Sequence, residues 1–240
     1  MNAPHPDLDK CNSFVMYHLS EKQRQKVSTS ESKPFITISR QAGAGGSKLA
    51  KALRDHFDKN YPLAEARWTV FDRDLVKWSM QDHGLPERFA HYLPEGHVSE
   101  ISSLIGELVG LHPSIWELNQ NVFETLVHLA RLGGVILVGR GAHIVTRNFD
   151  NGFHIRLVGS LDKRALRMVE MNQISLDQAI TLIRREDAAK GKWVRENFAE
   201  DINDPENYDI SINTDNFSVD ALVAMVDCLL AKRFSSFTKR

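Results

Sequence analysis

Short apolar runs alternate along the chain with longer segments in which apolar residues recur at helical spacing. The short runs predict buried strands at residues 35–39, 68–71, 135–138, 153–158 and 208–212. The longer segments predict amphipathic helices at residues 47–60, 115–132, 161–171, 176–195 and 219–234. Such alternation is typical of a parallel sheet covered on both faces, which binds ligands beyond the carboxyl ends of its strands. The chain is therefore predicted to be an α/β protein with a mostly parallel five-stranded sheet.

Two regions depart from this alternation. Residues 1–34 are mixed polar and end in a stretch with serines and a proline that breaks regular structure, so we interpret them as an N-terminal extension. Residues 75–132 carry glycines and prolines between helical pieces. We interpret them as a helical insertion that covers the second-substrate side of a single domain spanning residues 35–240.

The first predicted strand runs into a glycine-rich turn that opens a helix. Glycine has access to backbone angles closed to other residues, so this turn can aim successive N–H groups at one anion. The helix N-terminus beside it adds a partial positive charge. The hypothesis is a phosphate-binding loop, and the alternative is a turn that only reverses the chain. The predicted nucleotide-binding residues of this loop are Gly43, Ala44, Gly45, Gly46, Ser47 and Lys48.

The turn matches the phosphate-loop pattern G-x-x-x-x-G-K-[ST] only in part. Gly45 and Ser47 stand on the pattern, whereas Arg40 replaces the first glycine and Gly46 replaces the lysine. The Ser47 hydroxyl is predicted to bind Mg²⁺. The missing lysine normally follows the charge of the β- and γ-phosphates. Arg40 at the mouth of the loop and Lys48 are candidate replacements, and for each the alternative is a solvated surface cation.

Asp72 directly follows the second predicted strand. At the carboxyl end of a strand, its carboxylate is placed to orient an acceptor hydroxyl or to hold a Mg²⁺-bound water. The alternative is helix capping, because Asp is a favoured N-cap residue. Asp72 is therefore a predicted catalytic and metal-binding residue.

Composition narrows the partners and the location. The chain has 30 Lys and Arg against 31 Asp and Glu, a net charge of −1, which gives no global attraction to nucleic acid or an anionic membrane. Cys11 and Cys228 are far apart, and neither they nor the histidines have metal-ligand spacing. No leader peptide or membrane-length apolar run is evident. The expectation is a cytoplasmic protein with nucleotide substrates and no membrane or nucleic-acid partner.

Five motifs in a fixed order carry a family resemblance: Ile36-Thr-Ile-Ser-Arg-Gln-Ala-Gly-Ala-Gly-Gly46, Phe71-Asp-Arg-Asp74, Val138-Gly-Arg-Gly141, Ser160-Leu-Asp-Lys-Arg-Ala-Leu-Arg167 and Asp204-Pro-Glu-Asn-Tyr-Asp-Ile-Ser-Ile-Asn-Thr214. The chain resembles the cytidylate kinase-like proteins, which are P-loop nucleoside monophosphate kinases, from about residue 35 to its C-terminal helix. The resemblance implies the P-loop NTPase fold, a three-layer sandwich, with ATP and Mg²⁺ as cofactors.

The resemblance also implies roles for individual residues. Arg140 corresponds to an arginine that contacts the acceptor monophosphate, and Gly141 stands where cytidylate kinases carry an aspartate for the base. Residues 184–198 resemble the lid, whose cations close over the phosphates. The predicted lid residues are Arg184, Arg185, Asp187 and Lys190. Arg164 and Arg167 are similar to residues that flank the ATP base and phosphates, with an exposed helical face as the alternative.

The leading hypothesis is an ATP- and Mg²⁺-dependent kinase that phosphorylates a nucleoside monophosphate, with CMP and dCMP as first candidates. Gly141 leaves open a P-loop kinase with a different small-molecule acceptor. The missing loop lysine leaves open a nucleotide-binding regulatory protein that has lost turnover. The predicted catalytic residues are Arg40, Asp72, Arg140, Arg184, Arg185, Asp187 and Lys190.

Overall fold

A parallel β-sheet forms the centre of the protein. The computed structural model describes residues 33–61, 67–72, 123, 126–127, 129–139, 141–234 and 237. Within them, the sheet consists of β1 (Phe35–Arg40), β2 (Thr69–Phe71), β3 (Val135–Val138), β4 (Gly152–Val158) and β5 (Ile210–Asn213). The strand order is β2-β3-β1-β4-β5, and every described pair is parallel. The predicted α/β fold with a five-stranded sheet is confirmed.

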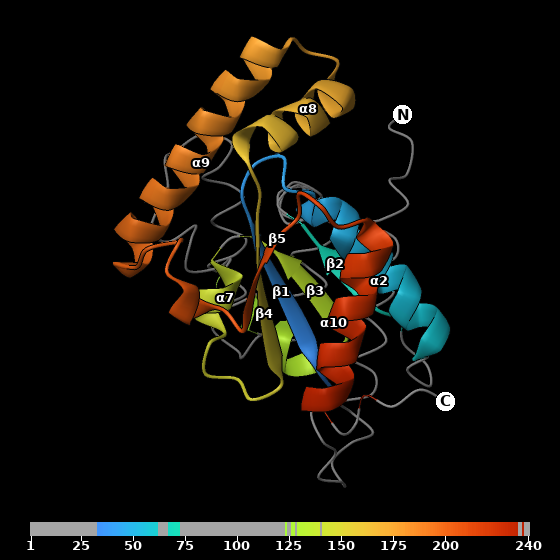
Figure 1. Ribbon diagram of the computed structural model, residues 1–240. Helices are drawn as coiled ribbons and strands as arrows, with labels where there is room; N and C mark the ends of the chain where they lie inside the picture. The colour runs from blue at the N-terminus through green and yellow to red at the C-terminus, as the bar shows by residue number, and fades with distance from the viewer. Residues whose placement is uncertain are drawn as a thin grey trace, which may run out of the picture.

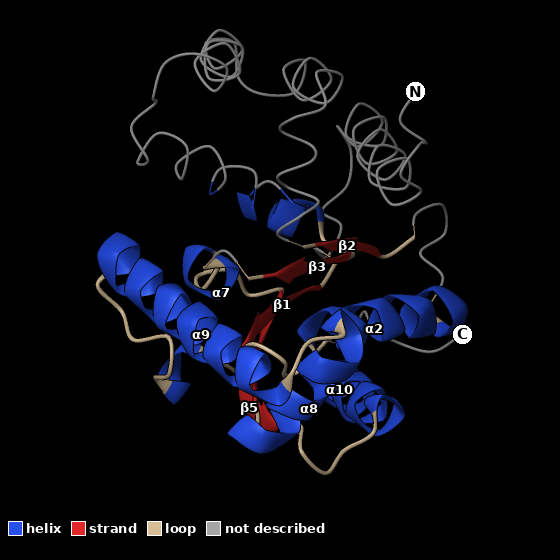
Figure 2. Ribbon diagram, turned by 90° about the horizontal axis from the view of Figure 1, so that it is seen from above, coloured by secondary structure: helices blue, strands red, loops and turns tan. Residues whose placement is uncertain are grey.

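Helices cover both faces of this sheet, which makes three layers. One face carries α2 (Gly46–Asn60) and α10 (Val219–Arg233), and the opposite face carries α7 (Ala142–Val145) and α9 (Leu176–Phe198), as Figure 2 shows. The helix α8 (Leu161–Asn172) follows β4, and together with α9 it extends beyond the carboxyl ends of the strands (Figure 1). A short 3-10 helix, η1 (Pro205–Asn207), leads into β5. The loop after β1 and the helices α8 and α9 therefore all lie at the carboxyl ends of the strands.

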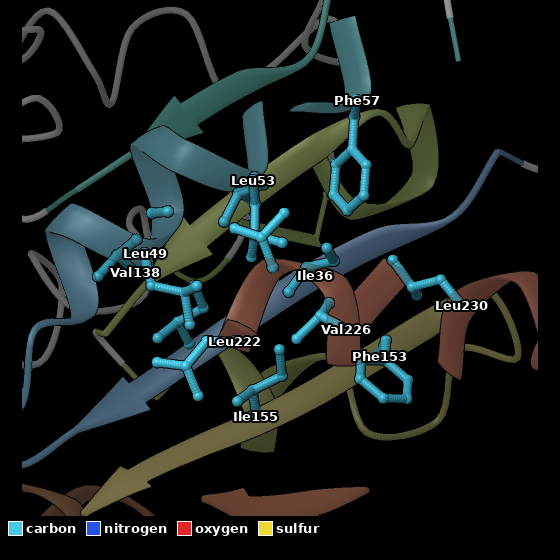
Figure 3. Packing of buried hydrophobic residues seen from close by; sticks show 14 of the residues in the cluster. Ile36, Leu49, Leu53, Phe57, Val138, Phe153, Ile155, Leu222, Val226 and Leu230 are labelled. Atoms are coloured by element: carbon cyan, nitrogen blue, oxygen red, sulfur yellow. The ribbon is translucent and has the colours of Figure 1, made fainter. Parts of the chain in front are cut away.

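The largest core cluster lies between the sheet and the α2–α10 layer. Alternate residues of β1 and β4 point to this side, and they interdigitate with apolar residues at helical spacing on the two helices. Figure 3 shows this packing for Ile36, Leu49, Leu53, Phe57, Val138, Phe153, Ile155, Leu222, Val226 and Leu230. All of these side chains are buried. The core therefore fixes β1 and α2, the two elements that hold the glycine-rich turn.

The predicted elements agree with the described ones to within about three residues at each end. Serine N-caps explain the sharp starts of three helices: Ser160 caps α8, Ser175 caps α9 in a capping box with Gln178, and Ser218 caps α10. The sequence did not predict α7 or η1. Both are single turns, too short to show a helical period.

Two predicted regions fall mainly outside the described residues. The extension at residues 1–34 is described only at Lys33 and Pro34, and most of the insertion at residues 75–132 lies in the stretch that is not described. The described residues between 123 and 132 are helical. None of the described helices combines the length and the apolar composition that crossing a bilayer requires.

Candidate active site

The glycine-rich turn joins the end of β1 to the start of α2. Gly43 and Gly45 have φ angles of +75° and +85°, a left-handed conformation that favours glycine. A Cβ added to Gly43 would lie 2.6 Å from the Arg164 carbonyl oxygen, so this residue rests against α8. At Gly45 an added Cβ would meet no heavy atom within 4 Å. The loop is therefore supported on one side and open on the other.

The first turn of α2 carries no acidic residue of its own. The N-cap residue of this helix, Gly45, offers no side-chain cap. The first N–H groups of any helix lack partners within the helix, and the helix dipole places partial positive charge there. The open side of the loop is therefore suited to bind an anion.

A cavity of about 420 Å³ lies on this open side. Its walls come from the loop, from the segment after β3, and from α7, α8 and α9. The lining residues that matter below are Arg40, Gly45, Gly46, Ser47, Lys48, Gly139, Gly141, His143, Met168, Met171, Lys190 and Trp193. The cavity thus lies beyond the carboxyl ends of the strands, where a doubly wound sheet binds its ligands.

Ser47 and Asp72 meet beside the loop. The Ser47 hydroxyl donates to Asp72 Oδ2 at 2.6 Å, and Arg40 Nη2 donates to Asp72 Oδ1 at 3.3 Å. Hydroxyl and carboxylate oxygens are hard ligands that suit Mg²⁺, which is usually held by one or two carboxylates together with waters and phosphates. No cluster of three or more His, Cys, Asp or Glu occurs among the described residues. The donor set therefore fits Mg²⁺ shared with a phosphate.

Asp187 of α9 is bound directly to the loop. Its Oδ1 accepts from the Ala42 backbone N–H at 2.7 Å, and its Oδ2 accepts from Arg164 Nη1 at 2.6 Å. Arg164 also donates to the carbonyls of Ala42 and Gly159, at 3.0 and 2.9 Å. The Arg164 side chain is 8% exposed, so these bonds are shielded from water. Arg164 and Asp187 together hold the loop, α8 and α9 in register.

Only some of the other predicted cations line the cavity. Lys190 and Lys48 line it, whereas Arg184 and Arg185 are exposed on α9 and are not part of its lining. Arg167 donates to the side-chain and backbone oxygens of Thr214 at 3.0 and 2.6 Å, and it too is absent from the lining. Arg140 lies outside the described residues.

Lys190 is the cation of α9 that faces the cavity. Burial lowers the pKa of its ammonium, and the positive charge of Arg40 acts in the same direction. Glu186 and Asp187 oppose the shift; Lys190 Nζ lies 3.2 Å from Glu186 and 3.8 Å from Asp187. α9 therefore brings Lys190 and its nearer carboxylate partner, Glu186, to the cavity wall.

His143 and Trp193 are among the lining residues that were not predicted to belong to the site. His143 is buried and stacks on Tyr208 with ring centroids 4.6 Å apart. Burial, with smaller contributions from His154, Arg156 and Arg147, lowers its pKa to about 3, so the imidazole is neutral. No partner for its Nε2 is present among the described residues. A lone histidine in an apolar stretch gives no sequence signal. Trp193, predicted to be a packing residue, packs against Phe198 and also lines the cavity.

Arg156 of β4 is a buried cation that the sequence analysis also missed. It donates to Ser39 Oγ at 2.8 Å and to Asn203 Oδ1 at 3.1 Å. It lines a second cavity, of about 250 Å³, together with Arg40, Asp187 and Lys190. Its place within a predicted buried strand gave no indication that it would line a cavity.

Gly141 packs against aromatic rings. Its φ angle is +66°, and a Cβ added there would lie 2.5 Å from Phe198 Cε2 and 3.3 Å from Trp193 Cζ3. An aspartate at this position would therefore be strained in its backbone and would collide with Phe198. Gly141, which stands where the resemblance implies an aspartate in cytidylate kinases, thus adjoins the rings of Phe198 and Trp193.

Comparison with known proteins agrees with this geometry. Residues 35–216 match the model of the cytidylate kinase-like family. The chain belongs to the cytidylate kinase-like family. It is similar to the cytidylate kinase of Pyrococcus horikoshii, with 27% identity over 195 residues, 81% of this chain and 86% of the relative. It is also similar to the cytidylate kinase of Thermococcus kodakarensis, with 26% identity over 192 residues, 80% and 84% of the two chains.

A solved structure supports the fold of this cytidylate kinase-like protein. An uncharacterized protein from Eubacterium ventriosum superposes with a TM-score of 0.59 at 17% identity, over 83% of this chain and 99% of that one. At this identity the likeness concerns the fold alone. The family match, together with the arrangement of loop and sheet, makes the chain an enzyme of the nucleoside monophosphate kinase type.

Proposed function

We propose that this protein transfers the γ-phosphoryl group of ATP, with Mg²⁺, to a nucleoside monophosphate. One observation carries the proposal: Ser47 Oγ and Asp72 Oδ2 are 2.6 Å apart at the N-terminus of a helix whose glycine-rich turn opens into a cavity. Phosphoryl transfer depends on positioning and on neutralising charge, so a backbone cradle, a Mg²⁺ site and cations are the parts it requires.

The described residues supply these parts as follows. The N–H groups around Gly45 and at the start of α2 would hold phosphate oxygens, and Ser47 and Asp72 would hold Mg²⁺. Bound there, Mg²⁺ neutralises charge on the phosphate oxygens. Lys190 and Arg40 would bring positive charge to the same cavity from two other elements. Asp187 would keep α9 at the loop through the Ala42 N–H.

The remaining predicted residues have supporting roles in this proposal. Arg140 would contact the acceptor phosphate, as the family resemblance implies. Arg184 and Arg185 project from the predicted lid, and lid closure would bring them toward the phosphates. Arg164 and Arg167 would act on the nucleotide through the loop, because their guanidinium groups bind loop and strand-end oxygens.

CMP and dCMP are the first candidate acceptors, because the curated relatives bear the name cytidylate kinase. The packing of Gly141 favours a second candidate, a kinase of the same mechanism with another small-molecule acceptor. A Cβ at this position would lie 2.5 Å from Phe198 Cε2, and the chain has glycine where the resemblance implies a cytosine-reading carboxylate.

The test is ADP formation by the purified full-length chain with ATP, Mg²⁺ and a panel of nucleoside monophosphates. We expect ADP with CMP or dCMP and about 100-fold less from Asp72→Asn. Asp55→Asn is the matched control, because Asp55 is an exposed carboxylate on α2 outside the cavity. Turnover with a non-pyrimidine acceptor alone would favour the second candidate. If the folded protein binds ATP but forms no ADP whichever acceptor of the panel is supplied, a regulatory protein would be indicated instead.

A further inference from the structure

A cation and a glycine have exchanged places in the phosphate loop. The pattern G-x-x-x-x-G-K-[ST] has glycine at its first position and lysine at its seventh. This chain has Arg40 at the first position and Gly46 at the seventh, while Gly45 and Ser47 remain on the pattern. Loss of the lysine and gain of the arginine thus occur within one short loop.

Gly46 is required for space and not for backbone conformation. It is the first residue of α2, and its φ angle is not in the left-handed region. A Cβ added to it would lie 2.9 Å from Arg40 Cγ and 3.2 Å from both Cβ and Cδ of Arg40. Gly45 is the opposite case, with φ of +85° and open space around it. The aliphatic stem of Arg40 therefore occupies the volume in which a lysine at position 46 would begin.

The guanidinium group of Arg40 lies over a second glycine. A Cβ at Gly139, directly after β3, would collide with Arg40 Nη1. Arg40 Nη2 is 3.3 Å from Asp72 Oδ1, on the carboxylate whose other oxygen binds Ser47. The Arg40 side chain is 20% exposed and lines the cavity. Its charge is thus held at the phosphate side of the cavity by two glycines and a carboxylate.

We propose that Arg40 takes the place of the loop lysine, and that Gly46 is a glycine because the Arg40 side chain runs over it. Gly139 also has a left-handed φ of +84°, which by itself favours glycine. The inference rests on the proposed function, since the charge that Arg40 would neutralise is that of the nucleotide phosphates. The planar guanidinium fork suits phosphate oxygens and can donate to two of them at once. Arg40 is then a catalytic residue that enters from the strand instead of from the helix.

The sharpest experiment restores the ordinary pattern. Arg40→Gln is expected to lower turnover about 100-fold. The double variant Arg40→Gly/Gly46→Lys recreates G-x-x-x-x-G-K-S. We expect its turnover to be at least about tenfold higher than that of Arg40→Gln. Gly46→Lys alone adds a cation against the Arg40 stem, and we expect it to be less active than the double variant. Arg54→Gln is the matched control, because Arg54 lies on α2 outside the cavity and pairs with Asp55.

Two further measurements do not depend on turnover. The affinity for ATP, measured by calorimetry, is expected to fall about tenfold in Arg40→Gln and to recover in the double variant. Gly46→Ala is expected to lower the unfolding midpoint of the natural chain by about 2–4 °C. The same substitution in an Arg40→Gly background is expected to cause no decrease, because the stem that the new Cβ meets is gone and alanine is otherwise well tolerated in a helix.

These outcomes separate this inference from the proposed function. If the natural chain forms no ADP with any acceptor, the proposed function fails. The ATP affinities and the unfolding midpoints still test whether Arg40 takes the place of the loop lysine. The inference is overturned if Arg40→Gln binds ATP as the natural chain does, or if Gly46→Ala shifts the midpoint equally in both backgrounds. A double variant no more active than Arg40→Gln would also overturn it.

Discussion

The two faces of the sheet differ in the residues that they bury. Toward α2 and α10, β1 and β4 present mainly apolar side chains, among them Ile36, Ile38 and Ile155, with Arg40 at the end of β1. Toward α7 and α9, four of the intervening residues are polar and buried, Thr37, Ser39, His154 and Arg156, and the buried Phe35 is apolar. The same two strands therefore build an apolar core on one side and a hydrogen-bonded layer on the other.

The polar layer lies below the cavity and most of its polar atoms bond within the protein, although Arg156 Nε has no hydrogen-bond partner among the described residues. Thr37 Oγ1 and His154 Nδ1 are 2.8 Å apart, and Ser39 binds both Arg156 and the Tyr208 hydroxyl. Burial lowers the pKa of His154 to about 4 despite the opposing charge of Asp209, so this imidazole is neutral. Buried polar groups are costly when they lack partners, which makes this face dependent on specific pairs. The apolar face depends only on volume and shape.

The largest expected effect is the acid sensitivity of the polar face. His143 and His154 have pKa values of about 3 and about 4 in the folded protein, below the ordinary 6.5. When the pH is lowered from 7 to 5, the unfolded chain gains protons at these histidines and the folded chain does not. The free energy of unfolding therefore decreases as the pH is lowered. The loss is about 2 kcal/mol per histidine at pH 5. Urea denaturation of the natural chain and of His143→Gln/His154→Gln at both pH values measures it. An unchanged pH dependence in the double variant would be evidence against neutral histidines.

The next effect belongs to the apolar face. Ile38→Ala removes a side chain that is 1% exposed, and it leaves a cavity between β1 and the two helices. The expected loss of unfolding free energy is about 3 kcal/mol, with the affinity of the folded protein for ATP unchanged. Denaturation together with calorimetry tests both parts. Weaker ATP binding without a loss of stability would contradict the division between the faces.

Ser39→Ala tests the adjacent residue of the same strand, which points to the other side. It deprives Arg156 Nη1 of its 2.8 Å acceptor and removes the 3.2 Å contact with the Tyr208 hydroxyl. Leaving a buried donor unpaired costs about 1–3 kcal/mol, so Ser39→Ala is expected to lower the free energy of unfolding by this amount. Urea denaturation gives this value. A loss no larger than that of an exposed Ser→Ala change would mean that Arg156 finds another partner.

The smallest effect is expected at the rim of the polar layer. Arg147 donates to Glu200 at 2.7 Å, but the Arg147 side chain is 46% exposed. Solvent screens such a pair, so Arg147→Ala is expected to leave the unfolding midpoint within the error of a thermal scan. A clear decrease would show that surface pairs, and not only buried ones, stabilise this side.

The contrast between the faces also explains how far the sequence can be interpreted. Strands and helices could be predicted from the spacing of apolar residues, because burial between the sheet and α2 and α10 imposes that spacing on β1 and on the two helices. Ser47 was predicted from the phosphate-loop pattern and Asp72 from its position after a strand, and in the structure Ser47 Oγ and Asp72 Oδ2 are 2.6 Å apart. These features depend on residues near one another in sequence or on one regular element.

The rest depends on distant residues that meet only in the fold. Arg156 and Ser39 are brought together across two strands, and Asp187 reaches the Ala42 N–H from another helix. The crowding of Gly46 by Arg40 cannot be found from the pattern alone, since a glycine in place of lysine appears there only as a loss. His143 carries no local signal at all.

Calorimetric titration of ATP into the full-length chain, with and without Mg²⁺, tests the central claim most directly. We predict that ATP binds in the presence of Mg²⁺. Asp72→Asn is expected to weaken this binding about tenfold or more, because Asp72 accepts from the Ser47 hydroxyl at the loop, where Mg²⁺ would be held. Asp55→Asn is expected to leave the binding unchanged. Folded natural protein that takes up no ATP in the presence of Mg²⁺ would contradict the account.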